Sequence, residues 1–181
     1  MRRIIAAWTV PALILPFWAM QIDDARAGQE AALHLTSAAF SDGRTIPAKH
    51  TCDGRNISPP LAWSPVPPGT KSFALIMDDP DATRGTWVHW VIYNIPPEIT
   101  ELAENVNPDE ELDRGIRQGG NSSMRIGYRG PCPPSGSHRY RFKLYALDTA
   151  LPLKPGATTA QVLRAMEGHV LAEARLTGRY R

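Results

Sequence analysis

The chain has 181 residues, of which 43% are hydrophobic, and its 20 basic and 18 acidic side chains give a formal net charge of +2. This length is enough for one domain with a buried core. The near balance of charge gives no electrostatic reason to expect nucleic acid or an anionic membrane as a partner. Basic residues do gather near the end of the chain, where a solvated face is the simplest interpretation of Arg164, Arg175, Arg179 and Arg181.

Residues 1–27 have the layout of a secretory signal peptide. A basic start is followed by an apolar run, Ile4 to Met20, and then by the small-x-small pattern Ala25-Arg26-Ala27, which is the order of segments in export signals. A membrane anchor is disfavoured because prolines interrupt the run, which is shorter than the roughly 20 residues of a spanning helix. We therefore expect cleavage after Ala27, export to the periplasm or the medium, a single domain over residues 28–181, and no transmembrane segment in the mature chain.

Further along, clusters of proline and glycine separate short segments with the character of strands. The first, Ser72 to Met77, is a compact apolar run, and the second, Trp87 to Ile95, is aromatic and β-branched almost throughout. The third, Tyr140 to Leu147, alternates with the period of a sheet that has one solvated face. Its two sets of positions are Tyr140, Phe142, Leu144 and Ala146 against Arg141, Lys143 and Tyr145. Short strands between turn clusters are typical of a β-sandwich or barrel.

Two segments have a different pattern. Glu98 to Gly120 is polar and weakly patterned, which predicts a long surface excursion. Thr158 to Glu173 is predicted to be a helix that begins at Thr158 or Thr159 as N-cap. Its apolar residues recur at helical spacing, at Val162, Leu163, Met166 and Val170.

Three polar clusters could carry chemistry. The first, Asp78-Asp79-Pro80-Asp81, has more carboxylates than one turn needs, although acidic residues at a strand end usually only solvate it. The second is His89, and a lone histidine inside a strand is more often packed than functional. The third is the proline- and glycine-dense loop Gly127 to Gly136, followed by His138-Arg139-Tyr140. Rigid loops at strand ends are places where binding sites are built.

Several familiar motifs are incomplete. The run Gly69 to Ser72 ends like a phosphate-binding loop, but Ser64 stands where that loop has its first glycine. A calcium loop starting at Asp79 fails because Arg84 occupies the position that requires glycine. The sequence has no G-x-S-x-G elbow of an α/β-hydrolase. We therefore expect neither a metal nor an organic cofactor.

Five sequence blocks occur in the order and at the spacing of one known family. They are Thr51-Cys52-Asp53-Gly54, Asp79-Pro80-Asp81-Ala82, Trp87-x-His89-Trp90, Gly130-Pro131-Cys132-Pro133-Pro134-x-Gly136 and His138-Arg139-Tyr140. Together they resemble the signature blocks of the phosphatidylethanolamine-binding protein family, in its bacterial, Raf kinase inhibitor-like branch. Thr83 and Val88 depart from eukaryotic members, which often have proline at the first position and in some cases histidine at the second. These departures weaken any transfer of kinase regulation or lipid specificity.

The resemblance implies a mainly β fold, an antiparallel β-sandwich with the predicted C-terminal helix at its periphery, and a small anion pocket where the motif loops converge. Carried over by motif position, the pocket lining is Asp79, His89, Pro134, His138 and Tyr140, with Asp81 beside them. The two histidines and the phenol can each donate a hydrogen bond to a phosphate or carboxylate oxygen. Asp79 suits another role, because it can accept a hydrogen bond from a histidine and fix its tautomer.

These features favour a non-enzymatic protein that binds a small phosphoryl or carboxylate group, such as phosphate or a phospholipid headgroup, and that acts through a protein partner still to be identified. The alternative is a hydrolase that uses the same Asp and His cluster as a zinc site or as an acid–base pair. The sequence shows no obvious nucleophile, which speaks against an enzyme. Inhibition of a protease or kinase is a third hypothesis that the resemblance allows.

The two cysteines, Cys52 and Cys132, lie far apart in the sequence and in no C-x-x-C pair, so thioredoxin-like chemistry and a zinc ribbon are unsupported. In an exported chain, two cysteines favour one disulfide, and both lie in turn-rich motif loops. We therefore expect a bond that ties the Pro133-Pro134 loop to the Thr51-Cys52 loop. Two buried free thiols are the alternative.

Overall fold

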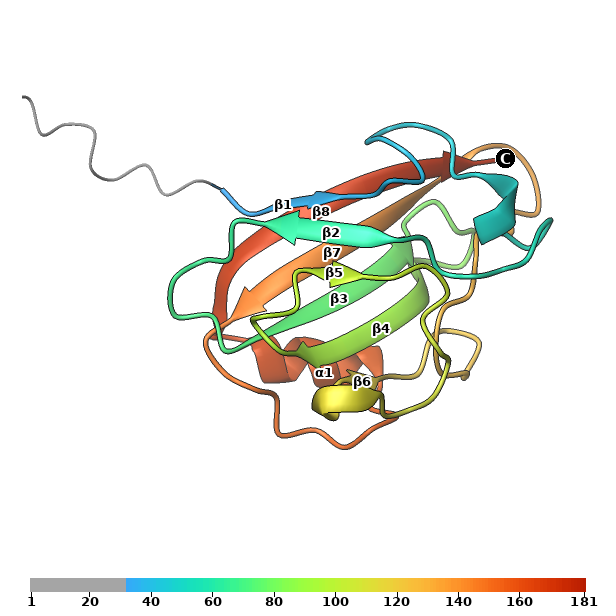
Figure 1. Ribbon diagram of the computed structural model, residues 1–181. Coiled ribbons are helices and arrows are strands. Elements are labelled where there is room, and N and C mark those ends of the chain that lie inside the picture. The colour runs from blue at the N-terminus through green and yellow to red at the C-terminus, as the bar shows by residue number, and fades with distance from the viewer. Residues whose placement is uncertain (1–31) are drawn as a thin grey trace, which may run out of the picture.

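The computed structural model describes residues 32–181, so the expected signal peptide lies outside the described residues. Two antiparallel sheets pack face to face, and one α-helix lies on the outer face of the larger sheet (Figure 1). The mainly β sandwich with a peripheral helix that the sequence predicts is therefore confirmed. Within residues 32–181, no helix is long and apolar enough to cross a membrane.

The larger sheet has the strand order β6-β4-β3-β7-β8 and the smaller one the order β1-β2-β5. The larger sheet consists of β3 (Ser72–Asp79), β4 (Trp87–Ile95), β6 (Arg117–Gln118), β7 (His138–Leu147) and β8 (Val170–Tyr180). The smaller sheet consists of β1 (His34–Thr36), β2 (Leu61–Ser64) and β5 (Glu101–Leu102). The helix is α1 (Thr159–Met166), and two short 3-10 turns are η1 (Ala48–His50) and η2 (Asp113–Gly115).

Strand β3 is buried along its whole length because both faces of the sheet are covered around it. Phe73, Leu75 and Met77 face the smaller sheet and belong to the main core. Ala74 and Ile76 face the opposite way and pack in a second core under α1. The continuous apolar run in the sequence is the signature of this two-sided burial.

The predicted helix begins where expected and ends earlier. Thr158 is the N-cap, and a capping box joins its side chain and backbone to Gln161. The helix ends at Met166 rather than at Glu173, because Gly168 adopts a positive φ of 79° and turns the chain. The residues from Val170 onward form β8, which pairs with β7 over its full length. Val170 fits the helical spacing by coincidence, and the last element of the fold is a strand.

Two other expectations hold only in part. The outward-facing side of β7 is not wholly solvated, because Tyr145 is buried in the second core against α1. The expected surface excursion, Glu98 to Gly120, is mostly exposed but contains β5, η2 and β6. Gln118 ties it to the sheet: its side chain accepts a hydrogen bond from Trp90 Nε1 at 2.7 Å and donates to two backbone carbonyls.

The free edge of β8 is partly covered by a segment from the other end of the described chain. The backbone of residues 43–46 exchanges hydrogen bonds with Thr177 and Arg179, through Gly43 N–H, Ile46 N–H and the Arg44 carbonyl. The Asp42 carboxylate also accepts from the Thr177 N–H. The last strand is therefore held between β7 on one side and an early loop on the other.

The sheet register brings three strand ends together at one end of the sandwich. Asp79, at the end of β3, lies opposite Trp87, at the start of β4. Asp78 lies opposite Arg141, near the start of β7. The loops that follow β3 and precede β7 therefore meet here, and this is where the predicted site residues lie.

Candidate functional site

A cavity of about 220 Å³ opens at this end of the sandwich. Its walls come from the end of β3, the start of β4, the start of β7 and the loop before β7. Five of the six residues predicted from the sequence line it together, namely Asp79, His89, Pro134, His138 and Tyr140. Residues that are up to 61 positions apart in the sequence numbering are thus brought around one small space, as the motif resemblance implies.

His138 and Asp79 form a buried pair on one wall of the cavity. Nδ1 of His138 lies 2.7 Å from Oδ2 of Asp79 and donates to it, while Oδ1 of Asp79 accepts from the Asp81 N–H at 2.8 Å. The two side chains are only 11% and 6% exposed. Because the carboxylate holds the proton on Nδ1, it fixes the tautomer of His138 and leaves Nε2 as the free nitrogen of the ring.

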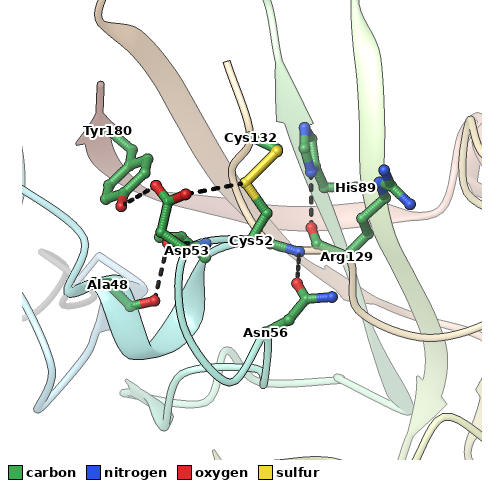
Figure 2. Close-up of a disulfide and its surroundings, with 10 residues drawn as sticks. Ala48, Cys52, Asp53, Asn56, His89, Arg129, Cys132 and Tyr180 are labelled. Atoms are coloured by element: carbon green, nitrogen blue, oxygen red, sulfur yellow. Dashed lines mark hydrogen bonds between the residues drawn. A yellow bond between two sulfur atoms is a disulfide. The ribbon is translucent and has the colours of Figure 1, made fainter. Parts of the chain in front are cut away.

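His89 is oriented in the same manner by a different acceptor. Its Nδ1 donates to the Arg129 carbonyl at 2.7 Å, which again leaves Nε2 free (Figure 2). Burial of the ring lowers its pKa, and the Arg129 carbonyl and the Asp79 charge oppose that shift without cancelling it. Without a ligand, His89 is therefore a neutral imidazole at neutral pH. A neutral ring in this tautomer presents a lone pair at Nε2, and protonation converts it to a donor.

Tyr140 stands between the two imidazoles. Its ring meets that of His89 edge-on at a centroid distance of 5.2 Å and lies nearly parallel to that of His138 at 6.5 Å. Its hydroxyl is buried and has no hydrogen-bond partner among residues 32–181. Burial and the nearby Asp79 charge raise the pKa of the phenol, so it keeps its proton. A buried donor without an acceptor is uncommon in folded proteins and calls for an explanation.

Asp81, the sixth predicted residue, lies beside the cavity and not in its lining. Its carboxylate accepts three hydrogen bonds from Arg139: from the backbone N–H at 2.9 Å, from Nε at 2.9 Å and from Nη2 at 2.6 Å. The Arg139 side chain holds the pKa of Asp81 well below its usual range. Because Arg139 directly follows His138, this contact fixes the start of β7 against the turn after β3 and keeps His138 next to Asp79.

The predicted disulfide between Cys52 and Cys132 is present, with a Cα–Cα distance of 5.4 Å (Figure 2). Cys132 lines the cavity, so the bond anchors a cavity wall to the loop at residues 51–56. Asn56 Oδ1 reinforces the same junction by accepting from the Gly130 N–H at 2.7 Å. The two loops approach so closely that a Cβ on Gly130 would lie 2.4 Å from the His50 carbonyl oxygen. Only glycine fits at this position.

Among the lining residues that were not predicted as site residues, Trp87 and Arg129 have the largest side chains. Both are exposed, and the Arg129 side chain forms no ion pair within the described part of the chain. Trp87 begins the third motif block, and Arg129 directly precedes the fourth, inside the Gly127 to Gly136 loop, and this was the available signal. Arg129 is a cation in a loop dense in glycine and proline. The sequence could not place it at the cavity, because its position depends on the path of that loop, which the disulfide and Asn56 determine.

The same residues do not form a metal site. Among residues 32–181, no three His, Cys, Asp or Glu side chains converge in an arrangement that could hold a metal ion. Asp79 and His138 are paired with each other through Oδ2 and Nδ1, so these two atoms are not available as metal ligands. The arrangement presents donors, and potential donors, to the cavity: two imidazole Nε2 positions and one phenol, with a guanidinium in the lining.

Comparison with known proteins gives a consistent result. The model of the phosphatidylethanolamine-binding protein family matches residues 36–181. A UPF0098 protein of Methanothermobacter thermautotrophicus is 60% identical over 149 residues, which are 82% of this chain and 99% of that protein. A UPF0098 protein of Aquifex aeolicus is 49% identical over 154 residues, covering 83% of this chain and 90% of that protein.

Two solved structures share the fold. A phosphatidylethanolamine-binding protein homologue from Chlamydia trachomatis superposes with a TM-score of 0.78 at 45% identity, over 84% of this chain and 99% of that one. YbcL of E. coli, described as a new member of the mammalian family of such proteins, gives a TM-score of 0.77 at 36% identity, over 83% and 99%.

Proposed function

The chain belongs to the phosphatidylethanolamine-binding protein family, and from this premise and the geometry of the cavity we propose that it is a non-enzymatic binding protein for a small phosphoryl or carboxylate group. One observation carries the proposal. Two histidines that line the same cavity each have Nδ1 occupied by an acceptor of the protein, beside a phenol whose hydroxyl has no partner among residues 32–181. The free polar atoms of all three side chains are suited to oxygen atoms of one ligand.

The binding chemistry follows from the fixed tautomers. A protonated imidazole donates from Nε2, so His89 and His138 can each give a charge-assisted hydrogen bond to an anionic oxygen. The Tyr140 hydroxyl supplies a third donor, and an anion there would satisfy its missing partner. Arg129 in the cavity lining adds a further positive charge. Asp79 offsets the charge on His138 from the far side of its ring, so the carboxylate does not itself face the anion.

We further propose that the mature protein works outside the cytoplasm, where it acts on a protein partner through its ligand state. The Cys52–Cys132 disulfide supports this location, because such bonds persist in oxidising compartments. The layout of residues 1–27 points the same way.

Affinity for sulfate should rise as pH falls through the histidine range. Burial lowers the pKa of His89 in the free protein, and a bound anion raises it by favouring the charged ring. Between the free and bound pKa values, binding takes up a proton, so affinity falls as pH rises through that window. Sulfate keeps its charge throughout, unlike phosphate. Calorimetry in buffers of different ionisation enthalpy measures the uptake, and binding without proton uptake at any pH would contradict a role for protonated His89.

Replacing Tyr140 with phenylalanine should weaken anion binding by about two- to tenfold, the value of one neutral hydrogen bond. Because the hydroxyl has no partner within the described chain, the free energy of unfolding should stay the same or rise. Tyr145→Phe, on the other face of the same strand, is the matched control and should bind normally. Titration calorimetry and urea unfolding measure the two quantities. Equal affinity of both variants would remove Tyr140 from the proposed site.

A further inference from the structure

The outer face of β7 and β8 carries a cluster of cations that the anion pocket does not use. We call it the outer basic face, and its members are Arg139, Arg141, Lys143, Arg175 and Arg179. They share one side of the sheet because alternate residues of β7 point outward, and the register places Arg139 opposite Arg179 and Lys143 opposite Arg175. Helix α1 packs over this side at Tyr145 and Leu147 and borders Arg141 and Lys143, whereas Arg139, Arg175 and Arg179 are exposed within the described chain.

The charges on this face are only partly compensated. Asp78 is 3% exposed and accepts from Arg141 Nε at 2.7 Å and from Lys143 Nζ at 2.6 Å. Arg139 is held by Asp81. Arg175 and Arg179 are exposed and have no carboxylate partner among residues 32–181. Three of the five cations are therefore fixed by two carboxylates, and the two on β8 are free to bind.

The arrangement has an energetic cost that folding alone does not explain. Like charges directly opposite each other on antiparallel strands destabilise the sheet. This face has two such pairs, Arg139 with Arg179 and Lys143 with Arg175. A neutral or acidic residue at either β8 position would relieve the repulsion without touching the core. Asp81 and Asp78 offset the charge of the β7 member of each pair, which leaves the β8 cations as the exposed positive charge. Because charged groups across an interface are arranged to be complementary, this face suits a partner of opposite charge.

We propose that the outer basic face is a docking surface for an extended acidic segment of another protein. The two cations that have no carboxylate partner among residues 32–181, Arg175 and Arg179, are four residues apart on β8, with Thr177 between them. An extended segment laid along the strand has the same repeat, about 6.8 Å for every two residues, so two carboxylates four residues apart on the segment would meet both cations. At the border with α1, a hollow of about 290 Å³, lined among others by Arg141, Lys143 and Leu163, can take a side chain of the segment.

A polypeptide is favoured over nucleic acid or a membrane because the cations are interleaved with fixed carboxylates. Asp78 lies between Arg141 and Lys143, and Glu173 is exposed on the same side, opposite Tyr145. Asp78 is buried and neutralised by its two cations, so the exposed Glu173, two residues from Arg175, is the point at which a polyanion with uniform charge would be repelled. A peptide can place neutral residues there, so a mixed pattern selects a partner residue by residue.

The test is binding of a short fluorescein-labelled poly-glutamate peptide to the purified protein, followed by fluorescence anisotropy. The double variant Arg175→Glu/Arg179→Glu should weaken binding about tenfold or more, because two attractions become repulsions. The milder Arg175→Gln/Arg179→Gln should lie between it and the parent. Arg55→Glu/Lys71→Glu makes the same charge change at two exposed positions elsewhere, and its affinity should stay within about twofold of the parent.

Thermal unfolding of the same variants separates binding from folding. Arg175→Glu should raise Tm, because the new carboxylate lies opposite Lys143. A lower Tm would contradict the claim that the face is held at a cost. Equal loss of peptide binding in the control variant would overturn the proposal, since the interaction would then depend only on overall charge. The proposal would also be overturned if the parent protein does not bind the peptide but binds anionic vesicles or duplex DNA through Arg175 and Arg179.

Discussion

Replacing His89 with alanine should weaken binding of sulfate or phosphate by about ten- to a hundredfold, because it removes one charge-assisted hydrogen bond worth roughly 1.5–3 kcal/mol. The effect should fall on affinity rather than on folding. The Nδ1 contact of His89 is to the Arg129 carbonyl, in an exposed loop residue that can bind water instead. Titration calorimetry at a pH below 6.5 is the appropriate measurement, since the ring is charged only after protonation.

His138→Ala should weaken binding to a similar extent but should also reduce stability. Its removal leaves the Asp79 carboxylate, 6% exposed, without its imidazole partner. Breaking one side of a buried pair costs about 3–5 kcal/mol, although the Asp81 N–H still donates to Asp79 and reduces that figure here. The double variant should be less than additive in affinity if both rings bind one group.

His169→Ala is the matched control for both histidines. Its Nδ1 also pairs with an aspartate, Asp148, but on the surface and far from the cavity lining. It should leave affinity unchanged. If His89→Ala and His138→Ala both bind as tightly as the parent, the two histidines are packed core residues and the anion site lies elsewhere.

Loss of the Cys52–Cys132 disulfide should lower the free energy of unfolding by on the order of 4 kcal/mol. The bond joins residues 80 positions apart, and a closed loop of that length removes about this much chain entropy from the unfolded state. The comparison is denaturant unfolding of the protein with and without reductant, and of Cys52→Ala/Cys132→Ala. The double variant should have the reduced stability and no response to reductant.

The same change should weaken anion binding as well as stability. Cys132 lines the cavity, and without the bond its loop would be joined to the loop at residues 50–56 by hydrogen bonds alone, among them those of Cys52 with Pro131 and of Asn56 with Gly130. Thiol titration under denaturing, non-reducing conditions checks the premise, and two reactive thiols per chain would show that the bond does not form. If the stability and the anion affinity of the oxidised protein do not change on addition of reductant, the bond contributes to neither.

The sequence predicted the strands that bury large side chains. β4 begins and ends at the predicted residues, and β7 shows the expected alternation, with Tyr140 and Phe142 facing the core. β8 was missed because its inward positions hold small residues, among them Ala174 and Gly178 opposite Leu144 and Tyr140. Small side chains give no period-two hydrophobic signal, and the strand exists because β7 offers it a complete ladder of partners.

The sequence predicted which residues gather around the cavity and one of their contacts, that of Asp79 with a histidine. The order of the motifs predicted that His89 and His138 lie close together, but it could not show which hydrogen-bond acceptor fixes each ring. Asp79 was expected to orient one histidine and contacts His138, whereas His89 is fixed by a backbone carbonyl, which no side-chain pattern reveals. Asp81 lies beside the cavity, as expected, but its contact with Arg139 was not predicted. Contacts of this kind depend on backbone paths set by tertiary structure.

The backbone hydrogen bonds between residues 43–46 and β8 have a consequence for the order of folding. Thr177 and Arg179 must be synthesised before that loop finds its backbone partners, and β7 lacks its outer neighbour until then. Contacts between the two ends of a domain form late, because the entropy cost of closing a long loop comes before the contacts contribute any stabilisation. These contacts can therefore form only after Arg179 has left the ribosome. Until β8 is in place, the open edge of β7 is a site at which another strand can pair, so completion of β8 protects the nascent domain from edge-to-edge association.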